Sequence, residues 1–139
     1  MIDNIWEKFS FTENKQKSAL DYLNDLKSGL TEQSAGELTL ETEAVNAIWD
    51  GNANRIAAVY KLFVVAPKLG NFRRKILSVA EYGETGRFPV DIINHFEDNF
   101  KYDNISEPGF MTKVNEILSN PIVKNSIENL FQQSREYNK

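Results

Sequence analysis

The sequence predicts an all-α protein, a compact single domain spanning residues 1–139 with about six or seven short helices. Three observations favour this class. Apolar residues recur at intervals of three and four along most of the chain. Capping residues and prolines stand where helices would begin, with glycines where they would end. The connections between these segments are short.

The first expected helix starts after Thr12, a residue type that caps helix N-termini, and ends before Gly29, which suits the position after a helix. Its apolar positions follow a helical spacing. They are Ala19, Leu20, Leu23 and Leu26.

Two further helices are expected over residues 40–49 and 53–66. The apolar positions of the second keep the helical spacing, at Ile56, Val59, Tyr60 and Phe63. The run LFVVA inside it is rich in β-branched and aromatic residues, which strands favour. A strand is therefore the main alternative there.

In the centre of the chain, Asn71 is expected to cap a helix that Gly83 ends, and Pro89 to occupy the first position of the next helix. The first of these helices would bury Phe72, Ile76, Val79 and Ala80, and the second would bury Val90, Ile93, Phe96 and Phe100.

The last two expected helices start near Ser106, with Pro108 in the first turn, and at Pro121, with Asn120 as the cap. Across the whole chain, the residues expected to be largely buried are Trp6, Leu20, Leu23, Ile48, Ile56, Val59, Phe63, Ile76, Val79, Ile93, Phe96, Val114, Ile117, Ile127 and Leu130.

The composition excludes several classes of protein. Hydrophobic residues make up 41% and charged residues 26%, which is typical of folded globular proteins. There is no cysteine, so neither disulfides nor thiolate chemistry are available. The N-terminal residues lack the pattern of a signal peptide, and no apolar stretch is long enough to cross a membrane. We expect a cytoplasmic location and no cofactor.

The stretch WDGNANRI, residues 49–56, places oxygen-bearing side chains at Asp50, Asn52 and Asn54, like the start of a calcium-binding loop. The position that needs the bidentate glutamate holds Lys61, and the position that needs glycine holds Arg55. We therefore interpret the stretch as a corner between two helices and not as a calcium site.

The single histidine, His95, would share one helix face with Asp91 and Asp98. One imidazole with two carboxylates is a poor ligand set for zinc or non-haem iron. That face is expected to be solvated. No phosphate-binding loop or nucleophile elbow is present, so catalysis is not expected.

Charge is distributed unevenly along the chain. Residues 1–54 carry four Lys and Arg against ten Asp and Glu, residues 55–87 carry seven against two, and residues 88–139 carry five against eight. The basic centre could pair with the acidic arms of its own chain, or bind a partner. The candidate binding residues are Lys68, Phe72, Arg73, Arg74, Lys75, Tyr82 and Arg87.

The favoured hypothesis is a small module that binds another protein with an acidic surface or groove, as an inhibitor, immunity protein or adaptor would. The alternative is a nucleic-acid-binding helical domain, which the acidic arms and the sequence pI of about 5.1 disfavour. A metal-dependent enzyme built on Asp91, His95 and Asp98 is the third hypothesis.

Overall fold

The computed structural model describes residues 4–12, 16–50, 55–83 and 86–137, and in this part of the chain the fold is α+β and not all-α. Five strands within these residues form one antiparallel sheet in which each strand pairs with its neighbours in sequence. The strands are β1 (Thr39–Asp50), β2 (Arg55–Ala66), β3 (Phe72–Tyr82), β4 (Val90–Asn94) and β5 (Phe100–Ile105).

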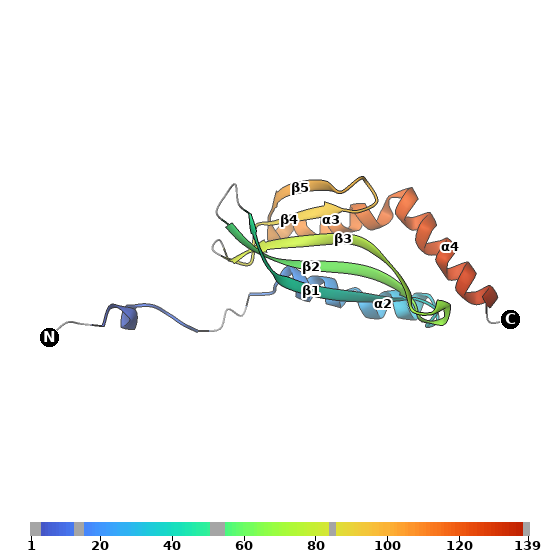
Figure 1. Ribbon diagram of the computed structural model, residues 1–139, viewed down its shortest axis with the longest axis horizontal. Helices are drawn as coiled ribbons and strands as arrows, with labels where there is room; N and C mark the ends of the chain where they lie inside the picture. The colour runs from blue at the N-terminus through green and yellow to red at the C-terminus, as the bar shows by residue number, and fades with distance from the viewer. Residues whose placement is uncertain (1–3, 13–15, 51–54, 84–85, 138–139) are drawn as a thin grey trace.

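The α-helices lie before and after the sheet in sequence, and the short helix η2 lies between β2 and β3. Figure 1 shows that α1, α2 and α3 lie along one face of the sheet, and that residues 4–12 extend away from the body at the end opposite to the end of α4. The bounds are η1 (Ile5–Lys8), α1 (Ala19–Asp25), α2 (Lys27–Gln33), η2 (Pro67–Leu69), α3 (Glu107–Ser119) and α4 (Pro121–Tyr137).

The predicted helices over residues 40–49, 53–66, 71–83 and 89–100 are wrong, because these segments form strands β1, β2, β3 and β4, and β5 begins at the end of the last one. The strand that the run LFVVA allowed is part of β2. Two features of these strands give their apolar residues a spacing like that of a helix. In β3, residues 76–82 are all buried, so no alternation marks the strand. The register also shifts between Leu62 and Phe63, which leaves Ile76 as an extra residue and changes the phase of the apolar spacing.

The two C-terminal helices are confirmed. Ser106 is the N-cap of α3, with a proline in the first turn, and Pro121 starts α4 after Asn120, whose side chain accepts a hydrogen bond from Ile122 N at 2.9 Å. The first predicted helix is only partly right. It starts after Ser18, and Gly29 lies inside α2 and does not end a helix.

Ser18 starts α1 because its side chain and that of Asp21 satisfy each other's backbone amides. Asp21 N donates to Ser18 Oγ at 3.1 Å, and Ser18 N donates to Asp21 Oδ2 at 3.0 Å. This reciprocal capping box satisfies two of the amides that a helix start leaves unpaired. Thr12 lies well before this start, so it is not the cap of α1.

The core lies between one face of the sheet, here called the helix face, and the helices. It contains Leu40, Val64, Val79 and Ile92 of the sheet together with Leu23, Phe110, Val114, Val123 and Leu130 of the helices. The opposite face, here called the open face, carries a smaller cluster of Ala57, Ala80 and Tyr82, with Val59 packed against it.

Burial was partly predicted. Leu23, Phe63, Ile76, Val79, Val114, Ile117 and Leu130 are buried as expected. Leu20, Val59, Ile93, Phe96 and Ile127 are half-buried. The prediction that Trp6 is buried is wrong, since this residue is 58% exposed in the segment that extends away from the body. Ile48 and Ile56 lie outside the residues whose side chains the structure describes.

Candidate functional site

The candidate residues of the basic centre do not form one surface, because residues 72–75 lie on strand β3. Arg73 pairs in register with Val65 and Arg74 with Val64, and successive side chains of a strand point to opposite faces. Val64 belongs to the core under the helices, so Arg74 lies on the helix face and Arg73 on the open face. In the helix expected between Asn71 and Gly83 these residues would have lain close together, and the strand separates them.

Lys68 and Arg73 pair with the acidic N-terminal arm of the chain. Lys68 Nζ lies 2.9 Å from Glu37 Oε1, and Arg73 Nη1 lies 3.0 Å from Glu43 Oε2. The guanidinium of Arg73 also lies 4.0 Å from the centre of the Phe63 ring. These two cations therefore pair with acidic residues of their own chain, which is one of the two interpretations of the charge pattern.

Phe72 and Arg74 line a groove between β3 and α4. The groove consists of two adjoining hollows of about 510 and 210 Å³, which share Phe72, Leu130 and Gln133. The larger one also has Leu69, Glu136 and Tyr137 in its wall, and the smaller one has Val64, Arg74, Ser126 and Asn129. We call this feature the α4 groove.

The turn before β3 places Phe72 in the α4 groove. Gly70 and Asn71 both have positive φ, 66° and 58°, a conformation that glycine adopts freely and that asparagine tolerates. This turn brings the chain from η2 back along β2, with Phe72 opposite Ala66. Asn71 therefore shapes a turn and does not cap a helix.

Arg74 is oriented by an aromatic ring. Its guanidinium carbon lies 4.2 Å from the centre of the Phe96 ring, within the range of a cation–π contact. Among the described residues, Arg74 forms no ion pair. Its charge therefore remains available to a carboxylate that enters the α4 groove.

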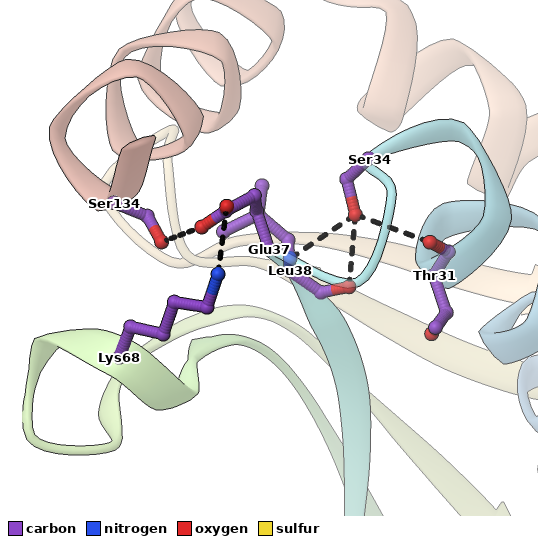
Figure 2. A network of polar contacts seen from close by, with 6 residues as sticks. All are labelled: Thr31, Ser34, Glu37, Leu38, Lys68 and Ser134. Carbon is purple, nitrogen blue, oxygen red and sulfur yellow. Dashed lines mark hydrogen bonds and ion pairs between the residues drawn. The ribbon is translucent and has the colours of Figure 1, made fainter. Parts of the chain in front are cut away.

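The wall of the α4 groove that α4 forms is held by a polar network around Glu37 (Figure 2). The Ser134 hydroxyl of α4 donates to Glu37 Oε2, while Lys68 approaches the other oxygen. Both side chains point toward Glu37 from different elements. The hydrogen bonds from Ser134 and Lys68 hold the pKa of Glu37 below the usual glutamate value. The network attaches α4 and η2 to the chain just before β1.

The other candidate residues lie elsewhere. Tyr82 is buried on the open face and donates a hydrogen bond of 2.6 Å to Asp91 Oδ2. Arg87 is half-buried, with Nη1 3.9 Å from Glu81 Oε1. Lys75 is half-buried on the open face, opposite Phe63. None of these three residues lines the α4 groove.

On the open face, His95 links β3 to the turn after β4. Its Nε2 lies 2.7 Å from Ser78 Oγ and its Nδ1 lies 2.6 Å from Asn99 Oδ1. Burial lowers the pKa of His95, the bond to Asn99 opposes this, and the charges of Lys75 and Lys61 lower the pKa further.

The proposed metal-binding face is not formed. Asp91 lies in a strand and accepts hydrogen bonds from Tyr82 and from Asn104 N, with Lys101 3.4 Å away. Burial raises the pKa of Asp91, but these partners outweigh it and hold the pKa below the usual value. Within the described ranges, no three acidic or histidine side chains gather as metal ligands.

The stretch WDGNANRI lies between two strands and not between two helices. Trp49 pairs with Ile56 and Asp50 with Arg55 at the ends of β1 and β2. Residues 51–54, which include Asn52 and Asn54, lie outside the described residues. The predicted corner between helices is therefore wrong as to the elements it joins.

Sequence reasoning missed the α4 side of the groove. Leu130, Gln133 and Tyr137 recur at helical spacing on α4, and Phe72 and Arg74 recur at the two-residue spacing of a strand. Each periodicity identifies one wall. The two walls come together only because α4 packs against the sheet, and the sequence pattern does not show this contact.

Comparison with known proteins gives no assignment. No protein-family model, no curated protein and no solved structure matches the chain. Among the described residues, none of the helices combines the length and apolar character needed to traverse a bilayer.

Proposed function

We propose that the chain binds another protein through the α4 groove, which receives a segment with a bulky apolar side chain beside a carboxylate. The observation that carries this proposal is the pairing of an exposed aromatic residue, Phe72, with Arg74 in one hollow. Aromatic residues and arginine are the residue types that dominate binding energy at protein interfaces.

The apolar part of the α4 groove is substantial. Phe72 is 50% exposed and Tyr137 is 71% exposed, although both are large aromatic side chains. The larger hollow, about 510 Å³, falls in the range of roughly 300 to 1,000 Å³ that is usual for binding pockets. A bulky apolar side chain entering it would remove these surfaces from water.

The polar part selects an acidic segment. Arg74 is held over the Phe96 ring, so its guanidinium loses little freedom when it binds a carboxylate. Gln133 adds an amide that can donate or accept a hydrogen bond. Glu136, which lines the larger hollow and not the smaller one, disfavours an occupant that is acidic throughout.

The nucleic-acid alternative receives less support. Binding to phosphates depends on the number of free cations, and Lys68 and Arg73 are engaged by Glu37 and Glu43. Of the other candidate cations, Arg87 lies 3.9 Å from Glu81, and Arg74 and Lys75 lie on opposite faces of the sheet. We therefore expect no measurable binding to mixed-sequence oligonucleotides at low salt.

The test is selection of peptides from a random displayed library against the intact chain, followed by calorimetry with the enriched peptides. We expect enrichment of an aromatic or large aliphatic residue next to Asp or Glu. Phe72→Ser and Arg74→Gln should each lower the affinity for these peptides by about tenfold or more, as for residues at the centre of an interface.

Phe100→Ser is the matched control. Phe100 is 55% exposed, close to the 50% of Phe72, and lies on β5 away from the α4 groove. The control variant should bind the peptides like the wild type. Peptides without the expected pattern, or equal losses for the Phe72 and Phe100 variants, would contradict the proposal.

A further inference from the structure

A short segment before α1 exposes a concentrated group of large apolar side chains. Within residues 4–12, Ile5 is 58% exposed, Trp6 58%, Phe9 52% and Phe11 79%. The rings contact one another, with centroids 5.0 Å apart for Trp6 and Phe9 and 5.8 Å apart for Phe9 and Phe11. We call residues 4–12 the aromatic segment.

The aromatic segment is locally ordered and contacts itself. Asn4 caps η1, since its side chain accepts a hydrogen bond from Trp6 N at 3.1 Å. Glu7 directly follows Trp6, and both residues lie in η1. Exposed apolar groups of this kind are typical of interaction sites.

The chemistry of the aromatic segment matches what the α4 groove selects. The α4 groove favours a bulky apolar side chain beside a carboxylate, and Trp6 with Glu7 supplies this pair. Glu7 is complementary in charge to Arg74, which forms no ion pair among the described residues.

The two features lie at opposite ends of the molecule. Figure 1 shows residues 4–12 leaving the body at the end of the sheet that is farther from η2 and from the C-terminal part of α4. An occupant supplied by a neighbouring copy needs no change in the path of the chain. Such a contact joins different surfaces on the two copies and can be repeated from copy to copy.

We propose that the aromatic segment of one copy docks into the α4 groove of a second copy, head to tail, with Trp6 against Phe72 and Glu7 near Arg74. The inference rests on the proposed function, because it names the occupant of the same groove. A contact made by one short segment buries less area than a standard interface, so the association is weak and depends on concentration.

The experiment is sedimentation velocity on the full chain over a wide concentration range. The wild type should form species larger than a monomer as its concentration rises. The double variant Trp6→Ser/Phe9→Ser, which lacks the docking side chains, and Phe72→Ser, which lacks the groove anchor, should each remain monomeric. Phe100→Ser should assemble like the wild type.

Mixing gives the decisive result. The Trp6→Ser/Phe9→Ser variant keeps an intact groove, and the Phe72→Ser variant keeps an intact aromatic segment, so an equimolar mixture should form dimers and nothing larger. A monomeric mixture, or assembly by either variant alone, would overturn the proposal. Thermal melts of all variants confirm that each is folded.

The outcome also separates this inference from the proposed function. If the wild type stays monomeric while the selected peptides still bind the α4 groove, self-association is overturned and the groove keeps its proposed role. If the selected peptides fail to bind as well, both proposals are overturned.

Discussion

The hydroxyl of Ser134 in α4 donates a hydrogen bond to the carboxylate of Glu37, which lies 97 residues earlier in the chain. Ser134 is fully buried, and Glu37 is also paired with Lys68 of η2. This contact fixes the helix that forms one wall of the α4 groove. Its loss should therefore affect both stability and binding.

Ser134→Ala removes the hydrogen bond without adding bulk. We expect it to lower the free energy of unfolding by about 1 kcal/mol, the usual net value of one intramolecular hydrogen bond. Urea denaturation measures this change. Ser28→Ala, at an exposed position in α2, is the control and should have almost no effect. Equal effects of the two substitutions would contradict the role assigned to Ser134.

Stability should depend on the ionisation of Glu37. Its pKa is lower in the folded chain than in the unfolded chain, so the unfolded chain binds a proton more readily in acid. The contribution is complete above the unfolded pKa, about 4.3, and is lost as the pH falls through the folded pKa. The stability difference between wild type and Glu37→Gln should therefore shrink below about pH 4. A difference that is constant or grows in acid would contradict this assignment.

His95 should titrate below the usual histidine value. It is the single histidine, so its ring protons give one resolved titration in NMR spectra. Burial and the charges of Lys75 and Lys61 lower its pKa. Its contribution to stability is complete above about pH 6.5 and is lost as the pH falls through the folded pKa. Lys75→Gln should move the titration midpoint upward, and a midpoint that does not move would contradict the proximity of the two charges.

Arg73 and Arg74 should have separable roles. Arg73→Ala removes an exposed ion pair and a cation–π contact, so it should reduce stability by about 1 kcal/mol and leave peptide binding unchanged. Arg74→Gln should do the opposite, weakening binding by about tenfold with a smaller change in stability. Denaturation and calorimetry on the same preparations measure both effects. Parallel effects of the two substitutions would show that one surface serves both roles.

The sequence predicted the C-terminal helices because their signals are local. Ser106 occupies the N-cap position of α3, Asn120 caps α4 with its side chain, and both stand next to prolines, so no distant residue is needed to interpret them. The central strands were missed because residues 76–82 of β3 are buried on both faces and the strand is out of phase with β2 by one residue at Ile76. Local spacing cannot distinguish such a strand from a helix.

For the candidate site, the sequence identified Phe72 and Arg74 but grouped them with cations that lie elsewhere. A helix would have placed Arg73 and Lys75 beside Phe72, whereas the strand places them on the opposite face. Arg73 pairs with Glu43 of β1, and Lys68 pairs with Glu37, which lies just before β1. Such pairing depends on which distant segments the fold brings together, and spacing along the chain does not encode it.

The most direct test of the central claim is a double-mutant cycle between Arg74 and the carboxylate of a selected peptide. Calorimetry would compare Arg74→Gln, a peptide with its acidic residue changed to the amide, and the two changes together. The α4 groove places these groups in contact, so we predict a coupling free energy of about 0.5 to 1.5 kcal/mol. Effects that add to within about 0.3 kcal/mol would show that the carboxylate does not meet Arg74, and would contradict the claim.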